Sequence, residues 1–347
     1  MNAPTSQKHC LFTHVKNPRK LLSIRLCKAH REAVTCYAMA QRKLKRPTRL
    51  ILDYDGTLTV KDTMAVLGSL PKHTKISWQY IVDAYMKDHA TYMDTPYPWK
   101  NYDRQEYSGW LAARKWVEQN SAQRVQAAAF FRGVTTEDVE QAVAKCLDNG
   151  ELQLRREWKE LFELFLPSYD AGDGTFLDSS VEILSVNWSE TAIRQALFQS
   201  AQGSGGDHNQ QLCHYINDIN IFANEIEGLA SPYGSSGRVV KPLDADIRTS
   251  GDKLRYLDVP APSAAGEHFT VYVGDSSTDF DALCAADLGI WLCDVAEADY
   301  EKASMKTFKP LKFIPPPLHS VSATEGFPAL FYWAPDLRSV IDTLSDT

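Results

Sequence analysis

The chain has 347 residues, of which 44% are hydrophobic and 23% are charged, and a formal net charge of −7. These values are typical of a soluble globular protein, and the length allows one large domain or two smaller ones. Because no apolar run approaches the roughly 18 residues of a membrane span, we expect no membrane partner. The seven cysteines include no CxxC pair, which is typical of reduced thiols in an intracellular protein.

The charge is distributed unevenly along the chain. Residues 1–50 contain 12 Lys and Arg and one acid, a net +11, which leaves −18 for the remainder. An acidic body argues against nucleic acid as a partner. We predict that residues 1–47 form a basic, disordered leader of a cytoplasmic protein. An Arg-rich, acid-poor segment is also typical of a mitochondrial presequence, which is the alternative, and Met39 is a possible later start.

We predict the first strand at Thr48–Leu52, a short and mostly apolar run that stops at Asp and Gly. Asp53 and Asp55 follow it, separated by one residue. Like charges at close range repel by about 4 kcal/mol at an effective dielectric near 20, so a chain that places them here usually has a positive group nearby. The alternative is an ordinary solvated turn, in which Asp and Gly are common.

Residues 64–150 have a helical pattern. Its clearest part is TTEDVEQAVAKCLDNG, residues 135–150, where Thr135 or Thr136 can cap the helix and Gly150 fits its end. Many Tyr and Trp side chains precede this helix. We expect most of them to pack inside the protein, while a few can line a pocket for an aromatic substrate.

Beyond residue 150, apolar strands alternate with helices. We predict, in chain order, a helix at 155–166, a strand at 181–189, a mobile Gly/Ser/Gln loop at 200–211, a strand within 218–227, a strand in HFTVYVG, an acidic loop with a short helix, and a strand in LGIWL. This alternation predicts a parallel α/β sheet with helices on both faces. In such sheets, ligands bind at the carboxyl ends of the strands, near a topological switch point.

Polar clusters follow these strands or lie in the loop before one: Asp53 with Asp55, Ser185 with Asn187, Lys253, and Asp275 with Asp279. Each alone has an ordinary structural explanation, such as a helix cap or a solvated lysine. Their order along the chain is more specific. DYDGT, LSVNWS, GDK and GDSSTD match the four motifs of the haloacid dehalogenase (HAD) superfamily of phosphotransferases, so the chain resembles that superfamily from Arg49 to its C-terminus.

The resemblance implies an α/β fold, a HAD-like doubly wound parallel sheet of residues 48–63 and 151–347, with an α-helical cap inserted at 64–150. LTVKDT, FFRGVTTEDVE and FANEIE make the chain most similar to the phosphoserine-phosphatase-like branch. The implied function is a Mg²⁺-dependent phosphatase that hydrolyses a small-molecule phosphomonoester. A phosphomutase or other phosphotransferase of the superfamily, and a non-catalytic HAD-like binding or regulatory protein, are the alternatives.

The resemblance also implies catalytic roles. Asp53 would attack phosphorus and form an aspartyl-phosphate, while Asp55 would protonate the leaving group and later deprotonate water. Lys253 would supply fixed positive charge. Asp53, the backbone carbonyl of Asp55 and Asp275 would hold Mg²⁺ through hard oxygen ligands, with Asp279 as a further ligand or as a residue that orients the others.

The resemblance also implies which residues contact the phosphate group and the rest of the substrate. Ser185 and the backbone amides around Gly56 and Asn187 would bind phosphate oxygens. Asp62, nine residues after the nucleophile, is the candidate substrate-binding acid, where phosphoserine phosphatases typically have a glutamate. The arginines expected of the cap do not match the family pattern, since Arg124 lies out of register, and Arg114 and Arg132 fit solvated helix positions. The sequence therefore does not fix the substrate as L-phosphoserine, and another small phosphomonoester is the alternative.

Overall fold

The computed structural model describes residues 43–97, 103–166, 178–202, 207–241, 246–257, 268–311, 313–320 and 329–346. Leu44–Thr347 form one compact unit, which is the subject of the following description. Residues 1–42 lie outside the described ranges, so the leader, the presequence and the alternative start at Met39 stay predictions. Among the described helices, none has both the length and the apolar character that crossing a membrane requires.

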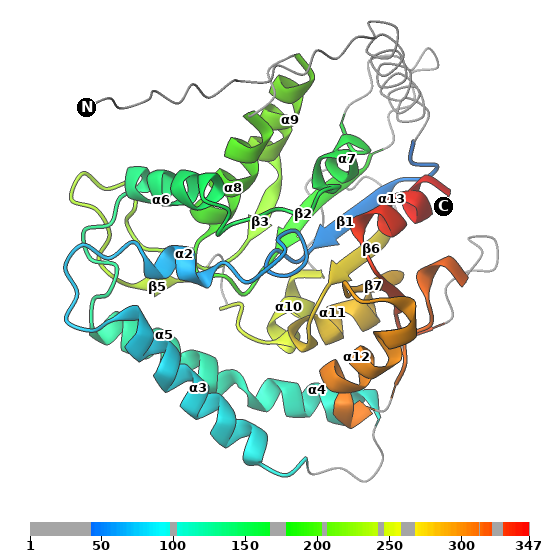
Figure 1. The fold of residues 1–347 in the computed structure, drawn as a ribbon, viewed down its shortest axis with the longest axis horizontal. Helices are drawn as coiled ribbons and strands as arrows, with labels where there is room; N and C mark the ends of the chain where they lie inside the picture. Colours follow the sequence, from blue (N-terminus) through cyan, green and yellow to red (C-terminus); the bar gives the residue numbers. More distant parts are fainter. Residues whose placement is uncertain are drawn as a thin grey trace, which may run out of the picture. The chain divides into compact units, whose positions relative to one another are not determined.

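A six-stranded parallel sheet with strand order β3-β2-β1-β6-β7-β8 forms the centre of this unit (Figure 1). Its strands are β1 (Thr48–Leu52), β2 (Ser180–Leu184), β3 (Asn220–Phe222), β6 (Phe269–Gly274), β7 (Leu288–Leu292) and β8 (Tyr332–Ala334). From β1 the chain builds outward through β2 and β3, then returns to β6 on the other side and continues to β8. The topological switch point therefore lies between β1 and β6, where a ligand site is expected.

Helices cover both faces of the sheet, and the strand residues show why. Leu50 and Leu52 of β1 belong to one buried apolar cluster, while Ile51 belongs to the other. In β6, Val271 belongs to the first cluster and Tyr272 to the second. This alternation arises because successive side chains of a strand point to opposite faces. The first cluster includes side chains of α6, α8, α9 and α13, and the second includes side chains of α4, α10 and α11. The predicted doubly wound α/β class is confirmed.

The helices are α2 (Met64–Gly68), α3 (Trp78–Asp94), α4 (Arg104–Ala113), α5 (Lys115–Ala127), α6 (Thr136–Asp148), α7 (Trp158–Glu163), α8 (Glu190–Gln202), α9 (Asp207–Asp218), α10 (Ser250–Leu257), α11 (Phe280–Ala285), α12 (Tyr300–Thr307) and α13 (Leu337–Asp346). A short antiparallel pair, β4 (Glu225–Ile226) and β5 (Val239–Val240), stands apart from the main sheet.

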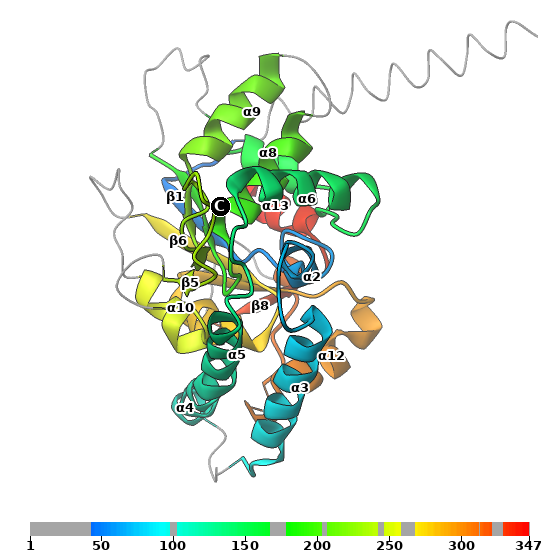
Figure 2. The same cartoon turned by 90° about the vertical axis from the view of Figure 1, so that its left-hand side faces the viewer.

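The segment between β1 and β2, which we call the helical insert, contains α2 to α7, and α3 and α5 run side by side in it (Figure 2). Its α4 packs on the core: the ring of the fully buried Tyr107 lies 4.6 Å from that of Phe280, and its hydroxyl donates to the Thr307 carbonyl at 3.3 Å. Trp78 of α3 packs against Trp188, which follows β2. The insert is thus fixed to the core by buried aromatic side chains. The boundaries of a separate cap domain stay a prediction.

Several predicted elements form where the local signals place them. β1 spans the predicted Thr48–Leu52. The α6 helix begins with a capping box, in which the Thr135 side chain accepts from the Asp138 amide and the Asp138 side chain accepts from the Thr135 amide. The strands and the short helix predicted around the GDSSTD motif are also present, as β6, α11 and β7.

Other predicted elements are shorter than expected. The helix predicted at 155–166 is α7, which starts only at Trp158, because Leu154 pairs with Thr59 and the Arg155 amide donates to the Leu58 carbonyl. The strand predicted at 181–189 spans only Ser180–Leu184.

Two further predictions need correction. The strand predicted within 218–227 divides into β3 and β4 around Asn224, whose amide donates to the Asn187 carbonyl. The mobile loop predicted at 200–211 is helical at both ends, since α8 buries Ala201 and α9 buries Leu212. Residues 203–206 lie outside the described ranges.

A buried ion pair ties α10 to the sheet. Arg49 of β1 donates to Glu182 of β2 through Nε at 3.1 Å and Nη2 at 2.8 Å, and both side chains are almost completely buried. The remaining nitrogen, Nη1, donates to the Leu257 carbonyl at the end of α10 at 2.7 Å. A guanidinium can satisfy both acceptors because its donors lie in a planar fork.

We expect Arg49→Met to lower the free energy of unfolding by about 3–5 kcal/mol, because it leaves the Glu182 carboxylate buried without its partner. The double variant Arg49→Met, Glu182→Leu should recover most of this loss, since apolar residues of similar volume commonly replace a buried ion pair at little cost. Urea unfolding of the three proteins checks both statements. A double variant as unstable as the single one would show that packing, and not the unpaired charge, is responsible.

Candidate functional site

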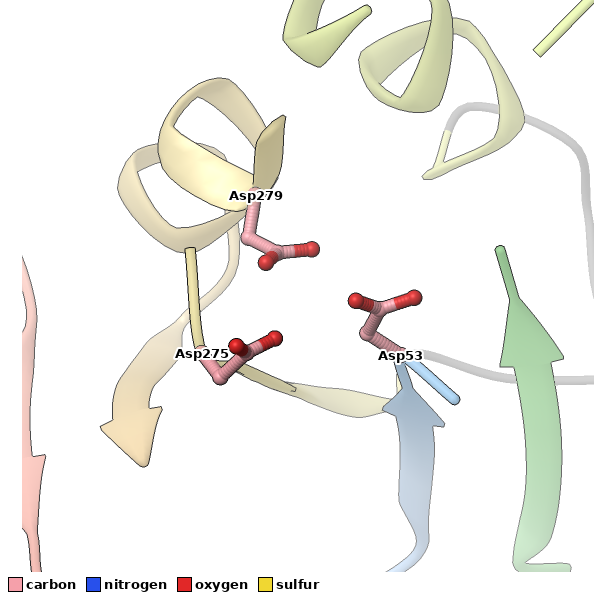
Figure 3. A group of neighbouring side chains, drawn as sticks. All are labelled: Asp53, Asp275 and Asp279. Carbon is pink, nitrogen blue, oxygen red and sulfur yellow. The ribbon is translucent and has the colours of Figure 1, made fainter. Parts of the chain in front are cut away.

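Three carboxyl groups meet at the carboxyl ends of β1 and β6, at the switch point of the sheet. Asp53 directly follows β1, and its amide donates to the Val273 carbonyl of β6 at 2.9 Å. Asp275 directly follows β6, and Asp279 lies on the helical turn after it. One oxygen of each carboxyl group lies within 4.8 Å of the others (Figure 3). Their positions after β1 and β6 agree with the strands predicted from the sequence, while their roles stay predictions.

Lys253 provides the positive charge expected beside the acid pair. It is fully buried, and its Nζ lies 2.8 Å from Asp53 Oδ1 and 2.6 Å from Asp279 Oδ1. Its predicted position in a loop before a strand is wrong, because it lies within α10. This helix forms because Asp252 Oδ2 accepts from the amide and hydroxyl of Thr249 at 3.1 and 3.0 Å and so caps its first turn.

Asp279 is already engaged at both oxygens. Its Oδ1 accepts from Lys253 Nζ and from the Tyr272 hydroxyl at 2.7 Å, and its Oδ2 accepts from the Ser276 amide at 3.0 Å. Of the two roles that the sequence left open, this geometry favours orientation of Lys253 over metal binding. Tyr272 was not predicted, since an aromatic residue inside an apolar strand indicates core packing and says nothing of where its hydroxyl points.

Asp275 lies against the loop that follows Asp53. Its Oδ1 accepts from the Thr57 hydroxyl at 3.3 Å, and its backbone carbonyl accepts from Trp291 Nε1 at 2.8 Å. Gly56 has a positive φ of 78°, and a Cβ atom on it would lie 2.4 Å from Asp275 Oδ2. The absence of a side chain at Gly56 therefore allows the loop to approach the Asp275 carboxylate.

The electrostatics of this cluster favour a cation. Burial and then the neighbouring Asp279 and Asp275 raise the pKa of Asp53 well above its ordinary value, although Lys253 opposes the shift. Burial and then Asp279 raise the pKa of Asp275 to about 7, again against Lys253. Carboxylate oxygens are the ligands that Mg²⁺ prefers, and a bound cation would remove the penalty on charging these groups. Asp53 and Asp275 therefore fit a hard divalent cation.

Asp55 is held apart from the three carboxyl groups. Its Oδ1 accepts from the amide and the hydroxyl of Thr63 at 2.7 and 2.6 Å, and its Oδ2 accepts from Asn187 Nδ2 at 2.7 Å. Burial, with a contribution from Asp62, raises the pKa of Asp55 to about 6, while the bonds from Thr63 and Asn187 limit the increase. A carboxyl group with such a pKa can both donate and accept a proton near neutral pH.

The residues predicted to bind phosphate form hydrogen bonds within the protein. The buried Ser185 accepts at Oγ from the Asn187 amide at 3.2 Å, and the Gly56 amide donates to the Thr59 hydroxyl at 3.1 Å. The Asn187 side chain orients Asp55, a role that the motif comparison did not indicate. Binding of phosphate by Ser185, Gly56 and Asn187 stays a prediction.

The residues considered for substrate binding differ in exposure and in ionic partners. Asp62 is exposed, and its Oδ1 accepts from the Met64 amide at the start of α2. Arg114 pairs with Glu118, Arg124 pairs with Asp88, and Arg132 is exposed. Substrate binding by Asp62 stays a prediction, and the pairing of Arg114 and Arg124 within the insert gives each a structural role.

Arg155 was missed by the sequence analysis. Its largely buried guanidinium donates to the Gly56 carbonyl at 2.9 Å and so supports the loop beside Asp275. The pairing of Leu154 with Thr59 and the bond from the Arg155 amide to the Leu58 carbonyl, contacts distant in sequence, bring Arg155 here. A local pattern contains no signal for it.

No protein-family model matches the chain, and no curated protein matches it. Among solved structures, a HAD family hydrolase from Salmonella enterica subsp. enterica serovar Typhi aligns with 75% of this chain at 14% identity and a TM-score of 0.38, and the chain spans 66% of its length. A phospho-aspartyl intermediate analogue of phosphoserine phosphatase aligns with 72% of this chain and 88% of its own, at 14% identity and a TM-score of 0.34. Similarity at this level does not assign a function.

We expect Gly56→Ala to be more destabilising than Gly133→Ala. Both glycines have the same left-handed conformation, with φ of 78° and 77°, but a Cβ at Gly133 meets nothing within 4 Å. The backbone strain of about 1–2 kcal/mol is common to both variants, while the contact with Asp275 should add about 1–3 kcal/mol at Gly56 alone. Urea unfolding of both proteins measures the difference, and equal losses would contradict it.

Proposed function

We propose that this protein is a Mg²⁺-dependent phosphatase that hydrolyses a small-molecule phosphomonoester through an aspartyl-phosphate on Asp53. The observation that carries the proposal is the surroundings of this carboxylate: it lies at the switch point between Lys253 and Asp275. A second carboxyl group, Asp55, follows two residues later and is fixed by Thr63 and Asn187. A nucleophile, a proton donor and fixed positive charge are the groups that phosphoryl transfer requires.

In the first step, an oxygen of Asp53 attacks phosphorus, and the bond between phosphorus and the leaving oxygen breaks. Asp55 gives its proton to that oxygen, which leaves as an alcohol. In the second step, water attacks the phosphorus of the aspartyl-phosphate, and Asp55 takes the proton of the water. The bond between phosphorus and Asp53 then breaks, which releases inorganic phosphate and regenerates both carboxyl groups.

In the proposed mechanism, Lys253 and a bound Mg²⁺ supply positive charge beside the phosphoryl group. Lys253 offers its ammonium group to the phosphoryl oxygens while Asp279 and Tyr272 fix its position. Mg²⁺ would be held by Asp53 and Asp275, together with the predicted backbone carbonyl of Asp55. When bound, it supplies positive charge that offsets the repulsion between the carboxylates and the substrate phosphate.

Asp55 also distinguishes between reactions. Cleavage of a carbon–halogen bond releases halide and needs no proton donor, whereas release of an alkoxide does. The hydrogen bonds from Thr63 and Asn187 hold the Asp55 carboxyl group in a defined orientation, which supports phosphate-ester cleavage. A panel of phosphorylated metabolites, assayed for released inorganic phosphate, would identify the substrate and distinguish hydrolysis from transfer to an acceptor.

We expect Asp53→Asn to reduce hydrolysis of an aryl phosphate at least about 1,000-fold, since the variant loses the attacking group. Asn has the same size, so the fold should persist, which circular dichroism can check. Asp218→Asn is a suitable control because Asp218 is an exposed acid at the end of α9, outside the cluster. Turnover by Asp53→Asn at the wild-type rate would exclude the mechanism, and an inactive wild type would favour a binding or regulatory protein.

We expect Mg²⁺ to raise the midpoint of thermal unfolding by about 5 °C at saturation, because a ligand that binds only the folded state stabilises it. Asp275→Asn should abolish the increase, while the control Asp218→Asn should retain it. Differential scanning calorimetry with Mg²⁺ and with excess chelator gives the result without reference to activity. The same increase in Asp275→Asn as in the wild type would place the cation elsewhere.

A further inference from the structure

A buried carboxylate joins the helical insert to the helix that carries Lys253. Asp252 lies in the first turn of α10, and its side chain is only 3% exposed. Its Oδ2 caps the helix by accepting from Thr249, as described above. Its Oδ1 accepts from Lys115 Nζ at 2.6 Å, and Lys115 is the first residue of α5. One side chain of the insert therefore contacts the residue adjacent to Lys253.

α10 also has other attachments, both to the core and to the insert. Arg49 of β1 binds the carbonyl of Leu257 at its end, and Tyr256 packs in the same apolar cluster as Leu111 of α4. At the start of the helix, Lys115 is the main ionic partner of Asp252. Arg255 lies 3.9 Å from the same oxygen with a side chain that is 63% exposed, so it contributes little.

We propose that Lys115 is a positioning residue that fixes the start of α10 and, through it, the ammonium group of Lys253 beside Asp53. This inference rests on the proposed phosphatase function. Lys253 Nζ lies 2.8 Å from Asp53 and 2.6 Å from Asp279, and a small movement of the helix start would lengthen both contacts. A misplacement of 1 Å far from the chemistry can lower a rate by about 100-fold. The insert thus contributes to catalysis by holding a group of the core.

The test compares Lys115→Met, Lys115→Arg and Arg255→Met with the wild type in steady-state hydrolysis of an aryl phosphate. We expect Lys115→Met to lower kcat by about 10-fold with KM changed by less than about 2-fold, because Lys253 acts on charge in the transition state. Lys115→Arg should restore most of kcat, since it keeps the cation. Arg255→Met, a matched control at the same carboxylate, should leave both constants at the wild-type level.

Inhibition by orthovanadate separates positioning from a loss of folded protein. Vanadate resembles the phosphoryl group in transfer, so its inhibition constant should rise in Lys115→Met by about the factor by which kcat falls. Partial unfolding would lower kcat and leave the inhibition constant unchanged, and that result would overturn the inference. If Lys115→Met does not fold, Lys115→Gln, which keeps a polar side chain at this partly exposed position, serves the same comparison.

Two further outcomes are decisive. Wild-type kcat and inhibition constants in Lys115→Met would overturn the positioning role alone, as would an equal loss in Arg255→Met. A wild-type protein that releases no phosphate from any ester would overturn the proposed function and, with it, this role.

A double variant, Lys115→Met with Asp252→Asn, adds a check. Its fold-loss of kcat should be smaller than the product of the two single fold-losses, because both substitutions break the same contact.

Discussion

The site depends on one buried ammonium group. Lys253 is fully buried, with Asp53 on one side and Asp279 on the other. A charge without partners in such a place costs several kcal/mol, so these two carboxylates make the buried lysine tolerable and are fixed by it in turn. Burial alone lowers the pKa of Lys253, but Asp279 and Asp53 raise it above the ordinary value of a lysine. Lys253 therefore remains charged, and Asp53 has a cation beside it before any ligand binds.

The rest of the fold serves to bring these groups together and to hold them. β1 and β6 are neighbours at the switch point of the sheet, so Asp53 and Asp275 meet although they are distant in sequence. The helical insert then reaches the site from two sides. Thr63, which precedes α2, binds Asp55, while Lys115 of α5 binds the cap of α10. The insert therefore orders the proposed proton donor and the helix of the lysine, in addition to its packing on the core.

The sequence predicts much of the architecture, because apolar strands stopped by Asp and Gly are local signals, and β1 and the α6 cap form as those signals indicate. It predicts less where a contact distant in sequence decides. Lys253 lies in a helix because Asp252 caps it, although TSGD is also typical of a loop. The Tyr272 hydroxyl meets Asp279, and Arg155 meets the Gly56 loop, only through tertiary packing. Residue identity could indicate the proposed reacting groups, but not the residues that contact and orient them.

The charge balance of the cluster is the physical argument for the proposed cation beside Asp53. Asp53, Asp275 and Asp279 carry three negative charges when ionised, and Lys253 compensates one of them, which leaves a charge of −2 in a mostly buried volume. Burial and the mutual repulsion of the acids disfavour this charge, which is why the pKa values of Asp53 and Asp275 are raised. A protonated Asp53 is a poor nucleophile. In the proposed mechanism a divalent cation would relieve the same charge and leave Asp53 ionised, so the geometry that concentrates the acids is the physical basis of the proposed metal dependence.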